Sequence, residues 1–556
     1  MQHWDLQADV VVVGSGGGAL TAAILAHDQG ANTVVLERTN KVGGTTACSG
    51  GAAWMPMNSH MKELGISDSR EEALAYCKKI TEGRAADSLV EAYVDNAPKI
   101  VDYLESKTPL RFSPMTMPDY HPEEPGGKLG GRALEAKLFN LNELGEWKDK
   151  VRSHAIPFMN HQTTEEQFVT YQMMLNPSNM PVDLVLDRME KGWVGRGNGL
   201  IAALLKGCLD RNITILLETR ALELIKEDGR VIGVRSQRQG KDFLVKAAGG
   251  VVLACGGFEW NEDLKKKHLY GVITHPVSPP FNEGDGTIMA AEVGADMINM
   301  HEVWWMQSTR IEGDEYEGKP YNQLCVTERI CPHSILVNRR GRRFVNESAS
   351  YNDISKSHFV VNENGTGYKN LPSWLILDSQ YRAKYHVQTI CPGDPDPEWL
   401  VKDDTLEGLA KKVGIDPAGL AETVARFNSF ARQGKDPDFD RGFSAYERYM
   451  GDPSAPHPNL GTIEKPPFYA VPMYAGALGT KGGPRTDHNG QVLDVRGRPI
   501  GGLYAAGNVM APVSGPGYYG PGGTIGPGIV FGFLAGRHAA EQAKARGYGR
   551  ASGVGR

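Results

Sequence analysis

Residues 9–37 read DVVVVGSGGGALTAAILAHDQGANTVVLE, and this stretch decides the fold. The β-branched run at 9–13 is typical of a strand that is buried on both faces. A glycine turn, GSGGGA at 14–19, leads directly into an alanine-rich segment that predicts a helix ending at Gly30. A second short apolar run, TVVLE, then ends on Glu37. The order of strand, glycine turn, helix, strand and acidic residue predicts the βαβ unit of a Rossmann-like α/β domain that binds a dinucleotide.

Each part of this unit has a mechanical reason. Gly14 permits the tight turn, and Gly16 lets the backbone approach a pyrophosphate at the N-terminus of the helix. Ala19 occupies the third small position, where helix and strand pack closely. Glu37 follows about twenty residues later, where a carboxylate can accept both hydroxyls of an adenosine ribose. A glycine-rich turn in an unrelated fold is the competing interpretation, and the surrounding βαβ pattern argues against it.

Two further glycine-rich segments favour FAD over NAD as the dinucleotide. GGTTACSGG at 43–51 is a second turn with hydroxyl donors, directly after the acidic strand. GGLYAAGN at 501–508 places a strand and a glycine turn near the other end of the sequence, and two-dinucleotide-fold (GR2-type) flavoproteins close their FAD site with such a strand and a helix. The residues predicted to bind FAD are Gly14, Ser15, Gly16, Gly18, Ala19, Glu37, Arg38, Gly44, Thr45, Thr46, Ser49, Gly50, Gly51, Ala221, Gly256, Gly257, Asp285, Gly507, Asn508, Thr524 and Ile525.

The composition excludes several other classes of function. A net charge of −6 gives no basic footprint for nucleic acid or an anionic membrane, and no apolar run is long enough to predict a spanning helix. Seven scattered cysteines form no CxxC pair, and no secretory signal is visible, so we expect reduced thiols and a cytoplasmic location. His121, His301 and His333 lack the spacing of metal ligands, so we expect no metal site.

A chain of 556 residues is too long for one ordinary domain. Because the glycine-rich ends must meet around one cofactor, the middle is expected to be inserted into the FAD-binding domain. We therefore predict an FAD-binding domain over 1–281 and 476–556, and an α+β catalytic domain over 282–475 that covers the flavin. Residues 132–200 are expected to form a lid or a helical excursion.

Shorter patterns predict elements within these domains. The segments ITILLETRALELI at 213–225 and VVLACGGFEWN at 251–261 are expected to be further strands of the FAD-binding domain, with a hairpin turn at 229–231. Two segments of the middle region, DDTLEGLAKKVG and LAETVARFNSFARQ, are expected to be helices.

Over nearly its whole length the chain resembles the fumarate reductase and 3-ketosteroid dehydrogenase superfamily of flavoproteins. The motifs that carry this resemblance are GSGGGA, GGTTACSGG, NEGDG, ILVNRRGRRFVNE at 335–347 and the tail from GTKGG at 479 to FGFLAGR at 537. Within the superfamily it is most similar to the 3-ketosteroid Δ1-dehydrogenases, through PDYHPEEPGG (118–127), KPYNQLCVTERICP (319–332), KGGPRTDHNGQVL (481–493) and GYYGPGGTIGPG (517–528).

The resemblance also implies a set of catalytic residues. In that family a tyrosine removes a proton from C2 of the steroid A ring while the flavin accepts a hydride from C1, and a second tyrosine beside the base tunes it. A third tyrosine and a backbone amide polarise the C3 carbonyl. Matched by position, the base is Tyr321, its helper is Tyr120, the carbonyl donor is Tyr518 and the amide donor is Gly522.

These residue types suit the chemistry. An α-proton of a ketone becomes acidic only when the developing enolate is stabilised, which one O–H and one N–H can do. A tyrosine titrates near 10, so a tyrosine base needs a neighbouring donor that favours its phenolate. The competing interpretation is that tyrosines in a pocket are amphipathic walls. A one-residue shift would exchange Tyr518 for Tyr519, and Trp304 and Trp305 are more typical of packing than of substrate contact.

The resemblance therefore implies an FAD-dependent oxidoreductase that desaturates a small apolar cyclic ketone, a 3-ketosteroid in the first instance, and passes electrons to a quinone or another acceptor. Two alternatives use the same chemistry: a dehydrogenase of a smaller, cyclohexanone-type ketone, and a 3-ketosteroid 4-ene (5α) dehydrogenase. Fumarate reduction is disfavoured, because a dicarboxylate needs arginine and histidine where this tail has tyrosine and glycine. A non-catalytic flavin-binding module is disfavoured by the tyrosines at all three matched positions. The segment Cys331-Pro332-His333 departs from the family pattern and is compatible with a different cyclic ketone.

Overall fold

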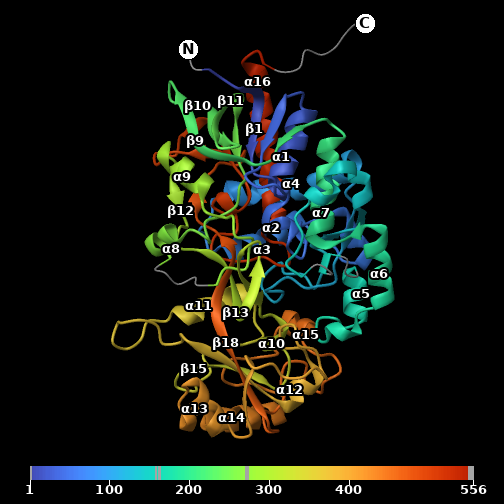
Figure 1. Ribbon diagram of the computed structural model, residues 1–556, viewed down its shortest axis with the longest axis vertical. Helices are drawn as coiled ribbons and strands as arrows, with labels where there is room; N and C mark the ends of the chain where they lie inside the picture. The colour runs from blue at the N-terminus through green and yellow to red at the C-terminus, as the bar shows by residue number, and fades with distance from the viewer. Residues whose placement is uncertain (1–2, 157–158, 161–163, 270–274, 549–556) are drawn as a thin grey trace.

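The computed structural model describes residues 3–156, 159–160, 164–269 and 275–548. Its two lobes are stacked along the long axis of the molecule, and each is built on a sheet of its own (Figure 1). The upper lobe contains β1 and α16, from the two ends of the chain, side by side. The glycine-rich ends therefore meet, as the sequence predicts.

The first sheet has five parallel strands at its centre. In spatial order they are β21 (Pro499–Ala505), β11 (Lys241–Leu253), β1 (Leu6–Val13), β2 (Thr33–Leu36) and β8 (Thr214–Leu216). The antiparallel strand β20 (Gln491–Leu493) lies at one edge, and a hairpin of β9 (Thr219–Glu227) and β10 (Arg230–Arg238) extends from β11. This arrangement confirms the predicted Rossmann-like α/β fold.

Two predicted strands differ in extent from those observed. The segment 213–225 is divided between β8 and β9, because Glu218 between them has a φ of 52°, which a continuing strand does not adopt. The segment 251–261 is extended only as far as Leu253, where β11 ends. The predicted hairpin turn is present, and Gly229 turns there with a φ of 79°.

Glycines bring the two ends of the chain together. Helix α1 (Gly17–Asp28) packs against the long C-terminal helix α16 (Ile525–Ala545). A Cβ added at Gly18 would lie 2.5 Å from the Gly528 carbonyl oxygen, and one at Gly532 would lie 2.2 Å from the Gly18 oxygen. Only residues without a side chain allow the helices to approach so closely.

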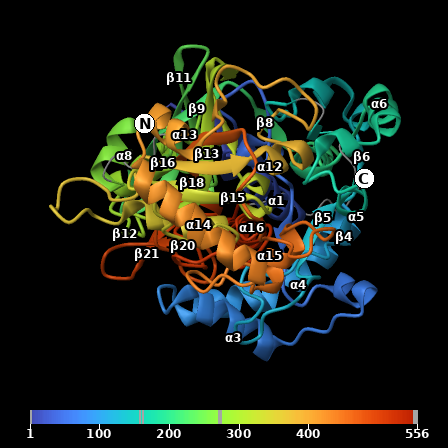
Figure 2. The same ribbon diagram turned by 90° about the horizontal axis from the view of Figure 1, so that it is seen from below.

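The second sheet forms the lower lobe. Its strands, in order, are β14 (Lys319–Leu324), β13 (Val303–Tyr316), β18 (Phe468–Thr480), β16 (Ser373–Asp378) and β15 (Ser334–Asn338), with β17 (Val401–Asp403) also paired to β18. The expected helices α13 (Leu406–Val413) and α14 (Pro417–Gln433) lie across its outer face (Figure 2).

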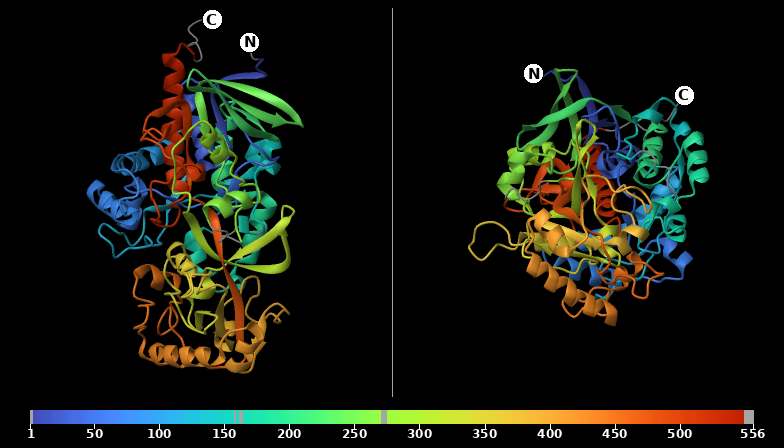
Figure 3. Two further views of the ribbon diagram at one scale, coloured as in Figure 1. Left: turned by 90° about the vertical axis from the view of Figure 1, so that its left-hand side faces the viewer. Right: turned by 60° about the horizontal axis from the view of Figure 1, so that its bottom comes forward.

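Strand β18 connects the lobes, as two further views make clear (Figure 3). Its first half pairs with β16 and its second half with β13, and it ends at Thr480 beside the first lobe. Helix α9 (Asp285–Glu292) packs against β9, so the first lobe includes residues beyond 281. Within 132–200, α5 (Glu165–Thr170) and α6 (Val182–Lys191) lie on the flank, and α7 (Arg196–Leu209) packs against α1.

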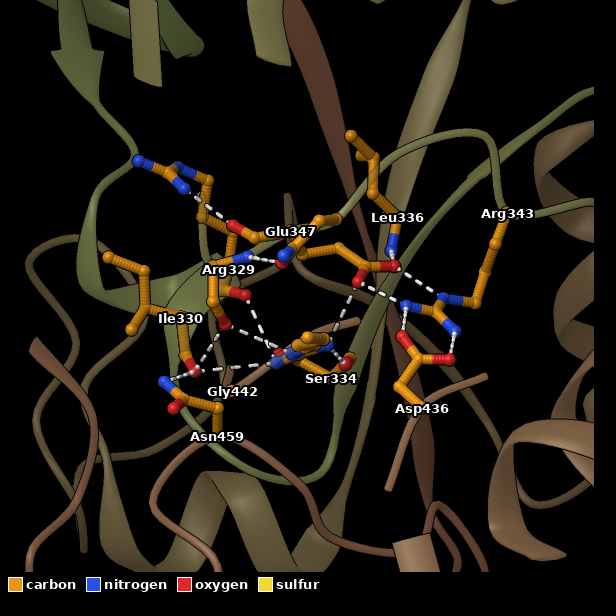
Figure 4. Close-up of polar contacts among 12 residues, drawn as sticks. Arg329, Ile330, Ser334, Leu336, Arg343, Glu347, Asp436, Gly442 and Asn459 are labelled. Carbon is orange, nitrogen blue, oxygen red and sulfur yellow. Dashed lines mark hydrogen bonds and ion pairs between the residues drawn. The ribbon is translucent and has the colours of Figure 1, made fainter. Parts of the chain in front are cut away.

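A buried network of arginines fixes the segment that precedes Tyr351 (Figure 4). The Arg343 Nη2 atom lies 2.7 Å from carboxylate oxygens of both Glu347 and Asp436. Arg329, which is fully buried, donates to the backbone carbonyl of Glu347. Moving this segment would separate buried charges from their partners, which is costly. The network therefore favours one conformation of the chain before Tyr351.

Candidate active site

A cavity of about 570 Å³ runs between the two lobes. Nearly all residues predicted to bind FAD line it, together with all four predicted catalytic residues. Ala19 and Gly257 do not. Ala19 is buried inside α1, and a Cβ at Gly257 would lie 2.2 Å from Thr480 Oγ1, so both residues serve close packing beside the cavity.

One end of the cavity fits a dinucleotide. Helix α1 begins at Gly17 at the cavity wall, and the residue before it, Gly16, provides no side-chain cap. The Gly17 N–H donates to Thr46 Oγ1 at 3.3 Å. Gly14 turns with a φ of 104°, where a Cβ would lie 2.4 Å from the Ala254 oxygen. Such a helix N-terminus, preceded by glycines and with the Thr46 hydroxyl beside it, suits a pyrophosphate.

The acidic residue of the dinucleotide motif is held in place before any ligand binds. Ser15 Oγ donates to one Glu37 carboxylate oxygen at 2.5 Å, and the Thr39 N–H donates to the other at 2.8 Å. The carboxylate is buried at the cavity wall, where it can accept ribose hydroxyls. Arg38 and Asp285, both predicted to bind FAD, are ion-paired to each other at 3.3 Å.

A cluster of tyrosines occupies the other end of the cavity. Tyr120, in a loop, and Tyr351, the first residue of α11 (Tyr351–Lys356), have hydroxyl oxygens 2.7 Å apart. The Tyr518 ring lies 5.1 Å from the Tyr120 ring and 5.6 Å from the Tyr351 ring, measured between centroids. The Tyr120 N–H donates to the Tyr519 carbonyl at 3.2 Å, which fixes the loop beside the tail. Three phenols from distant parts of the sequence therefore converge.

Burial controls the protonation of this cluster. Desolvation raises the pKa of Tyr120 and that of Tyr351 well above the ordinary value for tyrosine. Tyr120 and Tyr518 add to the increase at Tyr351, whereas the hydrogen bond with Tyr351 opposes the increase at Tyr120. Burial also raises the pKa of Tyr518, while its interactions with Tyr351 and Thr524 lower it. All three phenols are consequently neutral at pH 7 and can donate hydrogen bonds, and a phenolate among them would be strongly basic.

Tyr321 lies in the same cavity, but not in this cluster. It belongs to β14, and its ring packs against Tyr316 at 6.2 Å. Its hydroxyl makes no hydrogen bond to any residue that the structure describes, and burial raises its pKa to about 12. The sequence placed Tyr120 beside Tyr321, whereas the hydroxyl of Tyr120 is bonded to Tyr351. The predicted pairing of Tyr120 with Tyr321 therefore stays a prediction, and the structure adds Tyr351 as a second candidate for the partner of Tyr120.

The turn before α16 presents a free amide. The Gly522 N–H donates to no residue that the structure describes, and Gly522 lines the cavity. Its φ is 83°, and a Cβ there would lie 2.3 Å from the Ala52 carbonyl oxygen, so glycine is required for this turn. Tyr519 points away into a packed layer, stacked on Trp54 at 4.9 Å with its hydroxyl donating to the Val513 carbonyl.

Several residues of the site carried no recognised signal in the sequence. Tyr351 follows the motif ILVNRRGRRFVNE by four residues, which is the one feature that could have pointed to it. Tyr446 completes the cluster, with its ring 5.0 Å from that of Tyr120. Arg196 also lines the cavity, with its guanidinium 4.8 Å from the Phe168 ring, yet it forms no hydrogen bond or ion pair with the residues described here.

Metal-binding clusters and membrane-spanning helices were searched for in the described residues only. Within those ranges no group of three or more histidine, cysteine or acidic side chains is arranged to hold a metal ion. None of the helices described combines the length and the apolar character needed to cross a bilayer.

Comparisons with known proteins place this geometry in context. A family model described as "FAD binding domain" matches residues 9–525. A 4-oxocyclohexanecarboxylate 2-dehydrogenase of Sinomonas cyclohexanicum is 39% identical over 546 residues, which cover 96% of this chain and 93% of that protein. A 3-oxosteroid 1-dehydrogenase of Mycobacterium tuberculosis is 39% identical over 565 residues, which cover 97% and 99%. The crystal structure of 3-ketosteroid Δ1-dehydrogenase from Sterolibacterium denitrificans in complex with 1,4-androstadiene-3,17-dione matches with a TM-score of 0.89 and 36% identity, covering 96% of this chain and 99% of that one.

Proposed function

This chain belongs to the family of FAD-binding dehydrogenases that includes the 3-oxosteroid 1-dehydrogenases, and on that premise we propose that it introduces a double bond next to the carbonyl of a cyclic ketone. It is an FAD-dependent oxidoreductase that acts on CH–CH groups. The substrate favoured by the relatives is a 3-ketosteroid, desaturated between C1 and C2 of its A ring.

The tyrosine cluster supports a division of roles. The Tyr518 hydroxyl and the Gly522 N–H would bind the carbonyl oxygen and stabilise the negative charge that develops on it. Tyr351 would take the α-proton as a phenolate, to which the Tyr120 hydroxyl, 2.7 Å from that of Tyr351, could donate a hydrogen bond once Tyr351 has lost its own proton. FAD, when bound, supplies the acceptor for the hydride from the neighbouring carbon.

The observation that carries the proposal is the Tyr120–Tyr351 hydrogen bond of 2.7 Å, buried beside Tyr518. The Tyr351 hydroxyl has a neighbouring phenol within hydrogen-bond distance, whereas the Tyr321 hydroxyl has no hydrogen-bond partner among the described residues. We therefore assign the base to Tyr351. The expected base Tyr321 becomes a residue of the cavity wall.

The direct test is anaerobic mixing of the oxidised holoenzyme with candidate ketones. A 4-en-3-one steroid should bleach the flavin absorbance within one turnover and give the 1,4-dien-3-one. Cyclohexanone, which has the same reacting atoms without the other rings, is the matched comparison. Failure of every cyclic ketone to bleach the flavin would contradict the proposal, and formation of a 4-ene from a saturated 3-ketosteroid would favour the 5α alternative.

We propose that electrons leave to a quinone or a comparable acceptor and not to NAD(P). The sequence has one N-terminal dinucleotide fingerprint, and the segment VVLACGGF at 251–258 lacks the full turn for a second nucleotide. Turnover should therefore be sustained by a water-soluble quinone or an artificial dye. NADH oxidation at a rate that matches ketone reduction would contradict this assignment.

Arg196 favours a second candidate, a smaller cyclic ketone that carries a carboxylate. A guanidinium in the cavity that has no hydrogen bond or ion pair among the described residues, although it feels the charges of Glu135 and Glu165, suits such an anion, and the Sinomonas relative is named for one. If Arg196 binds that carboxylate, Arg196→Gln should lower kcat/KM for 4-oxocyclohexanecarboxylate roughly 10- to 150-fold, the range expected for a hydrogen bond to a charged group. The same variant should turn over cyclohexanone and a neutral steroid as the parent does. Equal effects on all three ketones, or loss of flavin, would exclude this role.

A further inference from the structure

Lys481 is the first residue after β18, and its side chain is completely buried. Its Nζ atom lies 2.8 Å from the Pro516 carbonyl oxygen, 2.9 Å from the Gly517 carbonyl oxygen and 3.3 Å from Asn352 Oδ1. It also lies 4.2 Å from the centre of the Trp304 ring. All three N–H donors of an ammonium group therefore have an acceptor.

This burial is unusual because no acid neutralises it. Among the residues that the structure describes, no carboxylate lies within ion-pair distance of Lys481, and its three acceptors are neutral oxygens. Taking an ammonium out of water without a counter-ion is costly. Desolvation, together with the nearby charge of Lys356, lowers the pKa of Lys481 to about 7. The neutral amine still has two N–H donors, so contacts to the carbonyls persist when the group loses its proton.

The acceptors identify what this lysine connects. Pro516 and Gly517 come directly before Tyr518, and Asn352 directly follows Tyr351. One side chain therefore spans the two segments that carry the proposed carbonyl donor and the proposed base. Trp304 extends the contact, since its ring lies under the ammonium and 4.9 Å from the Tyr518 ring.

We propose that Lys481 is the positioning residue of the active site, which holds the segment before Tyr518 against the segment after Tyr351 so that the two hydroxyls converge on one ketone. Lys481 does not line the cavity, so it acts through the tyrosines and not on the substrate. This inference rests on the roles proposed above for Tyr351 and Tyr518.

Lys356 provides a matched control. It lies on α11, and its Nζ reaches the same Pro516 carbonyl at 3.2 Å. Its side chain is 39% exposed, however, and it is ion-paired with Glu302 at 3.5 Å. Lys356→Met removes an ammonium from the same carbonyl but leaves the contacts of Lys481 in place. It should keep kcat within a factor of about two, because Glu302 retains an ion pair with Arg84 at 3.8 Å and Lys481 retains its three acceptors.

The experiment compares the holoenzymes of Lys481→Met, Lys481→Gln and Lys356→Met, with rates expressed per bound flavin. Lys481→Met removes every donor, so kcat should fall about 10²-fold, as displaced reacting groups typically cause, while KM changes far less. Lys481→Gln keeps two N–H donors for the Pro516 and Gly517 carbonyls and should recover part of that loss. Exchange of the substrate's α-hydrogen with solvent deuterium should slow in the same order, since it depends on both hydroxyls.

Three results would overturn the inference. A Lys481→Met enzyme that binds FAD and keeps a normal kcat and exchange rate would show that the contacts are not needed. An equal fall in kcat for Lys481→Gln and Lys481→Met would show that N–H donors at this position do not matter. Failure of both variants to fold would make Lys481 a residue of the fold and not of the site. Tyr351→Phe is measured in parallel, because its activity tests the proposed function independently of Lys481.

Discussion

Replacing Tyr351 by phenylalanine removes one oxygen atom from the site and nothing else. The ring would keep its contacts with the Tyr120 ring at 5.4 Å and with the Tyr518 ring at 5.6 Å. Tyr351 begins α11, far in the sequence from the glycine turns that line the dinucleotide end of the cavity. The variant should therefore fold and bind FAD, and an apolar ketone should still enter the cavity.

The expected loss has two parts. Without its proposed base, proton abstraction should slow by roughly 10²–10⁴. The Tyr120 hydroxyl, bonded to Tyr351 at 2.7 Å and buried, would lose its partner. An unsatisfied buried group of this kind costs about 1–3 kcal/mol, which should appear as a lower free energy of unfolding. This lower stability does not account for the kinetic loss, because the rates are measured on enzyme that is folded.

Two measurements separate the base from the rest of the reaction. Rapid mixing under anaerobic conditions gives the rate at which a saturating ketone bleaches the flavin. Incubation in deuterium oxide gives the exchange of the α-hydrogen, which needs the base but no hydride transfer. Both rates should fall together in Tyr351→Phe. Tyr321→Phe is the matched control, since it removes a phenol from the same cavity that has no hydrogen-bond partner among the described residues.

Near-normal bleaching and exchange in Tyr351→Phe would refute the reasoning from the Tyr120 hydrogen bond. If Tyr321→Phe lost both rates instead, the assignment expected from residues 319–332 would be restored. If both variants were impaired equally, neither phenol alone would be the base.

Three further outcomes are expected. Because burial raises the pKa of Tyr351 well above its ordinary value, and a base must be deprotonated, kcat/KM should rise with pH from 7 to about 10 without a plateau, and a plateau near neutrality in the pH–rate profile would contradict this. Gly522→Ala should lower kcat by about 10²–10³, because its Cβ would press on the Ala52 carbonyl and displace the amide donor; an unchanged rate would exclude Gly522 from carbonyl binding. Heat denaturation should release intact, non-covalent FAD, measured in the supernatant, because no recognised flavin-attachment motif is present; FMN in solution, or flavin left on the chain, would show otherwise.

The fold could be predicted from the sequence because its signals are local. The β-branched run at 9–13, the turn at Gly14 and the acidic Glu37 lie within one βαβ unit, and each has a geometric reason. Gly528 and Gly532 mark a helix that must approach another closely, and the observed partner is the helix of the same unit. The strand boundaries were less predictable, because a single residue with positive φ, Glu218, ends one strand and begins the next.

The candidate site was predictable only in part. Tyr518 and Gly522 lie within a glycine-rich motif of twelve residues, at 517–528, and both line the cavity. The proposed base Tyr351 was not predictable in this way, because the proposal depends on a contact between Tyr120 and Tyr351, which are 231 residues apart in the sequence. Tyr321 and Tyr351 both lie in segments of the lower lobe, and nothing in either segment states which phenol faces Tyr120. Which phenol faces Tyr120 depends on the positions of α11 and β14 in the folded lower lobe, and these are set by tertiary packing.

No sequence motif identifies the two buried basic residues beside the tyrosine cluster, and there is a physical reason for this. Arg329 and Lys481 are both fully buried, and both donate to backbone carbonyls next to the catalytic segments: Arg329 to the chain before Tyr351, Lys481 to the chain before Tyr518. Every residue has the same backbone carbonyl, so a hydrogen bond to a carbonyl does not require a particular residue at the accepting position. Motif reasoning detects groups that must have a particular side chain. Arg329 and Lys481 bond instead to backbone carbonyls, which every residue has, so only the folded chain reveals these contacts.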